Sequence, residues 1–109
     1  MATQYKVLGQ INPQNGTLTT LYTVPASTQT VISTITVCNQ VASAATFTIS
    51  VQPAGASVLA KHYVSFNTPL AANDTITLTL GVTLAATDII SCSANTNTIS
   101  FNAFGSEIS

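Results

Sequence analysis

Apolar and polar residues alternate with a period of two along most of this 109-residue chain. The alternation is clearest from Thr75 to Leu80, where Ile76, Leu78 and Leu80 take every second position and threonines lie between them. Successive side chains of a β-strand point to opposite faces, so this pattern places the apolar residues on one buried face. It predicts a strand over this segment.

Similar segments recur along the chain, rich in β-branched and aromatic residues and bounded by turn residues. The predicted strands cover residues 5–10, 18–24, 30–39, 46–51, 61–67, 75–80, 89–93 and 98–104. Within 30–39, Val31, Ile35 and Val37 are expected on the buried face. We therefore expect one all-β domain over residues 1–109, an antiparallel β-sandwich of about eight short strands. Jelly-roll-like connections are favoured, with immunoglobulin-like connections as the alternative.

Charged residues are scarce in this chain. They make up 5% of it, whereas about a quarter is usual for soluble domains, and the formal net charge is -1. Hydrophobic residues reach 46%, and 19 threonines replace much of the missing charge. Because solubility normally depends on charged surface, this composition favours a subunit that stays in permanent contact with other protein.

The few charges and cysteines also exclude several classes of partner. Lys6 and Lys61 are the only lysine or arginine residues, so we expect no binding to nucleic acid or to anionic membranes. No run of about 20 apolar residues predicts a membrane span, and no signal peptide is expected. Cys38 and Cys92 fall in predicted strands and are interpreted as small buried residues, with a disulfide between them left open.

Candidate catalytic chemistry is sparse. His62 is the only histidine and would have to serve every triad or proton-transfer mechanism, and no Gly-x-Ser-x-Gly motif provides a nucleophile. The carboxylates are limited to Asp74, Asp88 and Glu107, and no spacing typical of metal ligands occurs. The sequence therefore predicts no enzyme, no cofactor and no metal site.

Four residues are candidates for contact with other protein. Tyr5, Tyr22 and Phe104 lie near chain or strand ends and are interpreted as interface anchors, because Tyr and Phe are enriched in interfaces. His62 is interpreted as a surface or interface residue of a strand. The remaining aromatic residues mostly occupy strand positions and are assigned to core packing, in preference to a platform that stacks sugars or bases.

Several segments together resemble small structural proteins of tailed bacteriophages, including cyanophages. They are Leu-Tyr-Thr-Val-Pro-Ala at 21–26, the apolar strand at 31–39 that ends in Asn, the Ala-rich turn at 42–45, Ala-Asn-Asp-Thr at 72–75 and Phe-Asn-Ala-Phe-Gly-Ser-Glu at 101–107. The resemblance covers most of the chain. Where related sequences often have Gly-Lys after Pro-Ala, this chain has Ser27 and Thr28.

The resemblance implies a virion structural protein, foremost a capsid decoration or cement protein. Such a protein would bind the major capsid protein on the exterior of the head, after assembly in the host cytoplasm, and stabilise the shell. A homotrimer is expected, since such proteins commonly occupy threefold or quasi-threefold positions. The alternatives are a neck, tail or fibre module and a glycan-binding adhesion module.

Overall fold

The computed structural model describes residues 2–79 and 81–109, which form nine β-strands and two short 3-10 helices. Short segments of β-branched residues separated by Gly, Pro, Asn and Asp favour strands of this length. The elements are β1 (Thr3–Ile11), β2 (Thr19–Thr23), β3 (Gln29–Asn39), β4 (Ala45–Gln52), η1 (Pro53–Gly55), η2 (Ala60–His62), β5 (Tyr63–Leu70), β6 (Thr75–Leu78), β7 (Val82–Leu84), β8 (Ile89–Ala94) and β9 (Ile99–Ile108).

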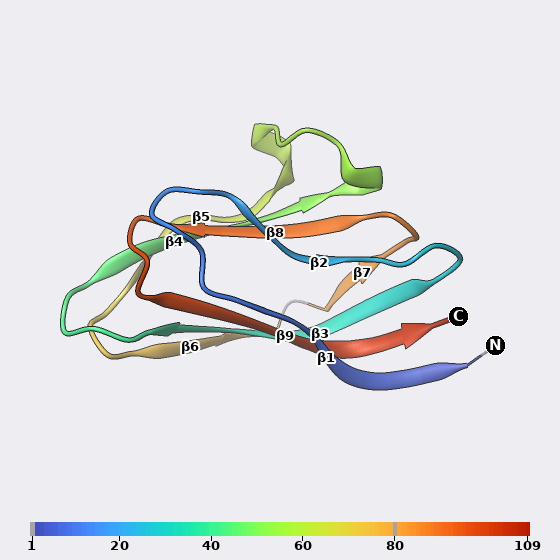
Figure 1. Ribbon diagram of the computed structural model, residues 1–109, viewed down its shortest axis with the longest axis horizontal. Coiled ribbons are helices and arrows are strands. Elements are labelled where there is room, and N and C mark those ends of the chain that lie inside the picture. The colour runs from blue at the N-terminus through green and yellow to red at the C-terminus, as the bar shows by residue number, and fades with distance from the viewer. Residues whose placement is uncertain (1, 80) are drawn as a thin grey trace.

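Two antiparallel sheets form a sandwich (Figure 1). Sheet A has the order β1-β9-β3-β6, with β7 also paired with β3, and sheet B has the order β2-β8-β4-β5. β6 and β7 pair in turn with the two halves of β3, so they share one strand position. Successive positions then alternate between the sheets, except that β4 and β5 are neighbours in sheet B, and this is the order of a jelly roll, the favoured connection rather than the immunoglobulin-like alternative.

The strand predictions hold in outline and differ at particular ends. The strand predicted at 75–80 ends at Leu78, and the expected position of Leu80 lies outside the described residues. β7 was not predicted, because its three residues are too short to show a period. The strand predicted from residue 61 begins at Tyr63, since the residues just before it form η2.

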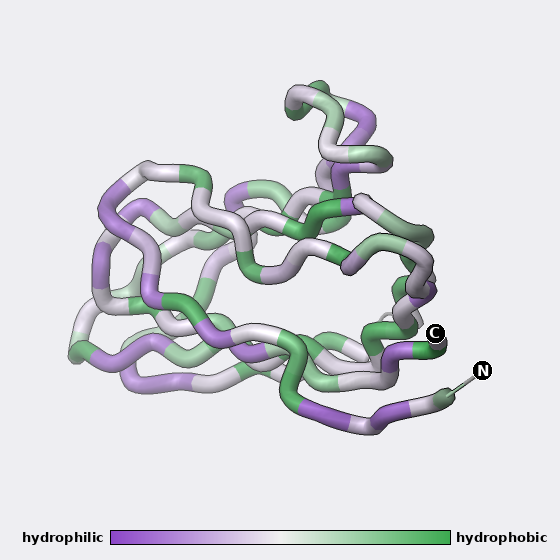
Figure 2. The backbone as a smooth tube through the Cα atoms, turned by 45° about the vertical axis from the view of Figure 1, so that its right-hand side comes forward, coloured by the Kyte–Doolittle hydropathy of each residue, from purple (hydrophilic) through white to green (hydrophobic). Residues whose placement is uncertain are grey.

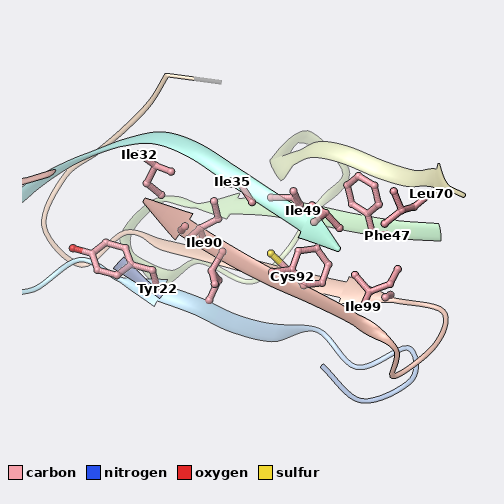
Figure 3. Packing of buried hydrophobic residues seen from close by; sticks show 14 of the residues in the cluster. Tyr22, Ile32, Ile35, Phe47, Ile49, Leu70, Ile90, Cys92 and Ile99 are labelled. Atoms are coloured by element: carbon pink, nitrogen blue, oxygen red, sulfur yellow. The ribbon is translucent and has the colours of Figure 1, made fainter. Parts of the chain in front are cut away.

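The core lies between the sheets and consists of their inward-facing residues (Figure 3). Phe47 of sheet B meets Phe101 of sheet A edge to face, with ring centroids 6.2 Å apart. Ile99, Phe101 and Ala103 share a buried face as predicted. Cys92 is buried in this core as expected, whereas Cys38 is half-buried, and both are free thiols.

The buried face of β3 changes phase at a β-bulge between Ile32 and Thr34. Ile32 is 1% exposed before the bulge, and Ile35 and Val37 are equally buried after it. The prediction that Val31 shares their face is wrong, because the extra residue reverses the alternation of side chains. Val31 is half-buried and lies on the outer face of sheet A.

The segment between β4 and β5, which includes η1 and η2, stands against the outside of sheet B (Figure 1). It covers one end of that sheet, where Ser50 and Ser91 are buried although they face outward. The Ser91 hydroxyl donates to Gln52 Oε1 at 2.7 Å and the Ser50 hydroxyl donates to the Ser91 carbonyl at 3.4 Å. The two outer faces of the sandwich are therefore differently covered.

Candidate functional site

The outer face of sheet A carries an apolar cluster that we call the contact face. It consists of Tyr5, Val7, Val31 and Phe104. Tyr5 is 86% exposed and Val7 49% exposed. Val7 pairs with Phe104 across β1 and β9, and Tyr5 and Val31 both pair with Ser106 from opposite sides, so the cluster spans three strands. An exposed cluster of this kind is typical of a surface that binds another protein.

The charge nearest to the contact face in sequence is that of Lys6, which borders the same surface hollow. Lys6 stands between Tyr5 and Val7 in β1, where alternation turns its side chain to the opposite side of the strand. Its Nζ lies 2.8 Å from Glu107 Oε1. Figure 2 shows hydrophilic residues near the N-terminus followed by hydrophobic ones farther along β1. The ion pair balances the charge of Lys6, so no unpaired ion lies beside the contact face.

β1 is also an edge strand of sheet A. An edge strand presents N–H and C=O groups that a further strand can pair with. At Gly9 the strand passes so close to β2 that a Cβ atom there would lie 2.1 Å from the Leu21 carbonyl oxygen. The accessible part of the edge is therefore the part before this crossing, beside Tyr5 and Val7.

A polar network lies behind the contact face and ties its strands together. The Tyr22 hydroxyl donates to Glu107 Oε2 and lies 2.8 Å from Thr30 Oγ1. Burial, together with the hydrogen bond to Glu107, raises the pKa of Tyr22 to about 12. The Lys6 ammonium and then the Tyr22 hydroxyl lower the pKa of Glu107. The network joins β1, β2, β3 and β9.

The structure corrects the placement of Tyr22. Its side chain is only 8% exposed and points into the sandwich (Figure 3). A side chain that is buried within its own chain cannot anchor a partner, so the interpretation of Tyr22 as an interface anchor is abandoned. Its location at a strand end gave no sign of this burial, because the opposing sheet that covers it is distant in sequence.

The structure also corrects His62. The residue ends η2 rather than lying in a strand, and it is 8% exposed. Its ring Nδ1 accepts a hydrogen bond from the Leu59 backbone N–H at 2.9 Å. The backbone N–H of His62 in turn donates to the Leu59 carbonyl at 2.9 Å. His62 thus closes a local turn and is not a surface anchor.

The two aspartates also serve local structure. Asp88 accepts from the Ala54 N–H at 2.8 Å and the Ala85 N–H at 2.9 Å, and Asp74 accepts from the Thr75 N–H at 2.9 Å. These bonds hold turns, as expected for Asp in such positions. Within residues 2–79 and 81–109, no group of three or more His, Cys, Asp or Glu residues is placed to hold a metal ion. Nor do these residues include a helix long and apolar enough to span a membrane.

The outer face of sheet B carries a groove of about 320 Å³, which we call the sheet B groove. The aromatic rings of Tyr63 and Phe66 form one wall, and Leu18 lies in the lining as well. Neutral polar residues of β4 and β8, among them Thr48 and Ser93, complete the lining. The groove lies on the opposite side of the sandwich from the contact face.

Reasoning from sequence found two of the four residues of the contact face, Tyr5 and Phe104, and missed Val7 and Val31. Val7 follows Tyr5 at the spacing of one strand face, which is a signal that could have identified it. Val31 gives no such signal, because the bulge in β3 moves it outward. Tyr63 and Phe66 were likewise assigned to packing, and their shared face depends on irregular pairing of β5.

Comparison with known proteins gives no family for this chain. No model of a protein family matches it, and no curated protein does.

Proposed function

We propose that this protein is a structural component of a tailed-phage virion, most specifically a decoration or cement protein of the head. The assignment to a virion rests on the sequence resemblance. The observation that supports protein binding is the contact face, where Tyr5 is 86% exposed on a neutral, apolar surface. A monomer in solution gains nothing from holding a tyrosine in this position, whereas a subunit within an assembly buries it.

The contact face would stabilise a shell by lying across the boundary between coat subunits. Burial of apolar surface contributes about 25 cal/mol per Å² before the costs of association are subtracted. Tyr5 brings a large ring with few rotatable bonds, which reduces the entropy lost on binding. The accessible edge of β1 adds main-chain hydrogen bonds if the partner offers an extended segment.

The proposed assembly unit is a homotrimer bound to the major capsid protein on the capsid exterior. Trimers place three contact faces on a threefold position, so that each site gains from the other two once the first is bound. The scarcity of charge supports an assembled rather than a free subunit.

Sedimentation with empty heads of the parent phage tests this proposal. We expect the isolated protein to sediment as a trimer and to pellet with the shells. The double variant Tyr5→Ser/Val7→Ser is expected to stay in the supernatant, since both side chains are exposed in the free chain. The matched control is Val64→Ser, an exposed residue of β5 in sheet B, which should pellet like the unchanged protein.

A monodisperse monomer that ignores the shells would overturn the proposal. Labelling the protein in whole particles tests its location independently. Label spread over the head supports a cement protein, whereas label at a single vertex or on the tail would replace it by a neck, tail or fibre module.

A further inference from the structure

We infer that the sheet B groove is a binding site for a neutral saccharide. The groove combines an aromatic wall with uncharged hydroxyl and amide groups, and these are the two kinds of contact that a sugar ring offers: apolar C–H faces and hydroxyl edges. Its volume of about 320 Å³ lies at the small end of ligand sites, which span roughly 300–1,000 Å³. The inference does not depend on the proposed role in the virion.

The aromatic wall exists because β5 is irregular. Residues three apart in a regular strand point to opposite faces, so Tyr63 and Phe66 should be separated by the sheet. The pairing of β4 with β5 shifts register twice, between Phe47 and Ile49 and between Ile49 and Ser50. The two rings are thereby brought to the same side, with centroids 4.8 Å apart. Bulges that re-aim side chains are enriched beside functional sites.

Phe66 is the most informative residue of this wall. It is 61% exposed, although it lies on a sheet face where a polar residue would be expected. Its ring is tilted by 56° against that of Tyr63, so the pair presents an angled surface rather than a closed stack. A ligand that packs its apolar face against Phe66 would remove this exposed surface from water.

The floor of the groove offers hydrogen-bonding groups that the fold leaves free. Thr48 Oγ1 accepts a hydrogen bond from the Asn67 N–H at 3.0 Å, which leaves its hydroxyl proton to donate. Asn95 Oδ1 accepts from the Thr46 N–H at 3.0 Å, which leaves the Asn95 amide donors. Within the described part of the chain, the Ser93 hydroxyl forms no side-chain hydrogen bond. These groups match the hydroxyls of a sugar.

The rim opposite the aromatic wall is held in place by main-chain bonds. The Gly16 N–H donates to the Ala94 carbonyl at 2.7 Å, and Asn15 forms an isolated bridge with the same residue. Gly16 adopts a φ of 65°, which glycine reaches without steric cost. Leu18 follows at 41% exposure and lines the groove. The site is therefore preformed, which lowers the entropy lost on binding.

The absence of charged side chains from the lining favours a neutral ligand. No charged side chain of the described residues lines the groove. An acidic sugar or a nucleic acid strand would bring negative charge without a cation to meet it, and a nucleic acid normally depends on such cations. A neutral saccharide needs only stacking and hydrogen bonds.

A glycan array that carries neutral and acidic oligosaccharides, together with a single-stranded oligonucleotide, tests this inference. We expect binding to neutral glycans. The strongest neutral glycan is then titrated against variants. Phe66→Ala should weaken its binding about ten-fold or more, as expected when a stacking aromatic side chain is lost. Ser93→Ala should weaken it less.

Two controls separate this site from the contact face. Val64→Ala removes an exposed side chain from the same strand but outside the groove and should leave the affinity unchanged. Tyr5→Ser/Val7→Ser should keep glycan binding while losing the shells, and Phe66→Ala should keep the shells while losing the glycan. Binding of acidic glycans or the oligonucleotide alone, no binding at all, or a Phe66→Ala affinity equal to that of the unchanged protein would each overturn the inference.

Discussion

The two outer faces of the sandwich are built from the same few residue types, yet they present different surfaces. The outer face of sheet A carries the contact face, with Tyr5 and Val7 exposed beside a strand edge. The outer face of sheet B is covered at one end by η1 and η2 and is hollowed beside Tyr63 and Phe66. The first suits a broad protein partner, and the second suits a small ligand.

Each surface includes a residue or pair whose position depends on an interruption in the alternation of side chains. In sheet A the bulge in β3 turns Val31 outward. In sheet B the two register shifts between β4 and β5 bring Tyr63 and Phe66 together. A regular β3 would have turned Val31 inward, and a regular β5 would have placed Tyr63 and Phe66 on opposite faces of the sheet. The comparison indicates that bulges contribute to both surfaces, through Val31 in sheet A and through Tyr63 and Phe66 in sheet B, whereas Tyr5 and Val7 are exposed by regular alternation in β1.

The largest loss of stability is expected for variants of the core that lies beneath both faces. Phe47→Ala or Phe101→Ala should each lower the free energy of unfolding by about 3–5 kcal/mol, because each removes a fully buried ring. Urea unfolding followed by ¹⁹F NMR of fluorine-labelled tyrosines measures this free energy. The signal of Tyr5 reports unfolding at the contact face, and that of Tyr63 reports unfolding at the groove. One common midpoint is expected for both signals.

The milder variants Phe47→Leu and Phe101→Leu complete this test through a double-mutant cycle. Their effects should be coupled by about 1 kcal/mol because the two rings are in contact. Separate midpoints for Tyr5 and Tyr63, or strictly additive effects, would contradict a shared core and would make the two faces independent units.

A smaller loss of stability is expected when a glycine near either face is replaced by alanine, and the loss should differ between the two faces. A Cβ atom on Gly105 would lie 2.0 Å from the Val31 carbonyl oxygen, so Gly105→Ala should cost about 3 kcal/mol by forcing β9 and β3 apart. Gly16 at the rim of the groove has open space around it, and Gly16→Ala should cost only about 1 kcal/mol, from its φ of 65°. Chemical denaturation of both variants measures the difference. Equal losses would show that β9 and β3 are not held together this closely.

The smallest effect on stability concerns pH and should arise in the polar network behind the contact face. The pKa of Glu107 is lowered in the folded chain, so its contribution is present above the usual pKa of glutamate and is lost as the pH falls through the lowered value. The pKa of Tyr22 is raised to about 12, so its contribution is present below about pH 10 and is lost as the pH rises through 12. The loss on acidification should amount to about 1 kcal/mol, the size of one hydrogen bond.

Unfolding curves measured from acid to alkaline pH test both dependences, which form the acid limb and the alkaline limb of a plot of stability against pH. Glu107→Gln should flatten the acid limb, and Tyr22→Phe should flatten the alkaline limb. Amide hydrogen exchange should quicken in β1 before it does in β4 on acidification, because Glu107 is bound to Lys6 of β1. An acid limb that survives in Glu107→Gln would assign the dependence to another carboxylate.

Much of the fold could be predicted from local pattern. The alternation at Ile99, Phe101 and Ala103 identified a buried face because each strand carries its own period. The turn residues separated the strands because Gly, Pro, Asn and Asp act on the backbone locally. These features depend on neighbouring residues, so the sequence alone determined them.

Other features depended on contacts between distant segments. Tyr22 and His62 looked like surface residues, but the opposing sheet buries the first and the turn of η2 buries the second. The outward position of Val31 and the pairing of Tyr63 with Phe66 follow from register shifts, which neighbouring strands impose and no single strand encodes. The alternation thus determined which residues could form a sandwich, whereas only the tertiary structure decided which of them face out, because register is a property of paired strands.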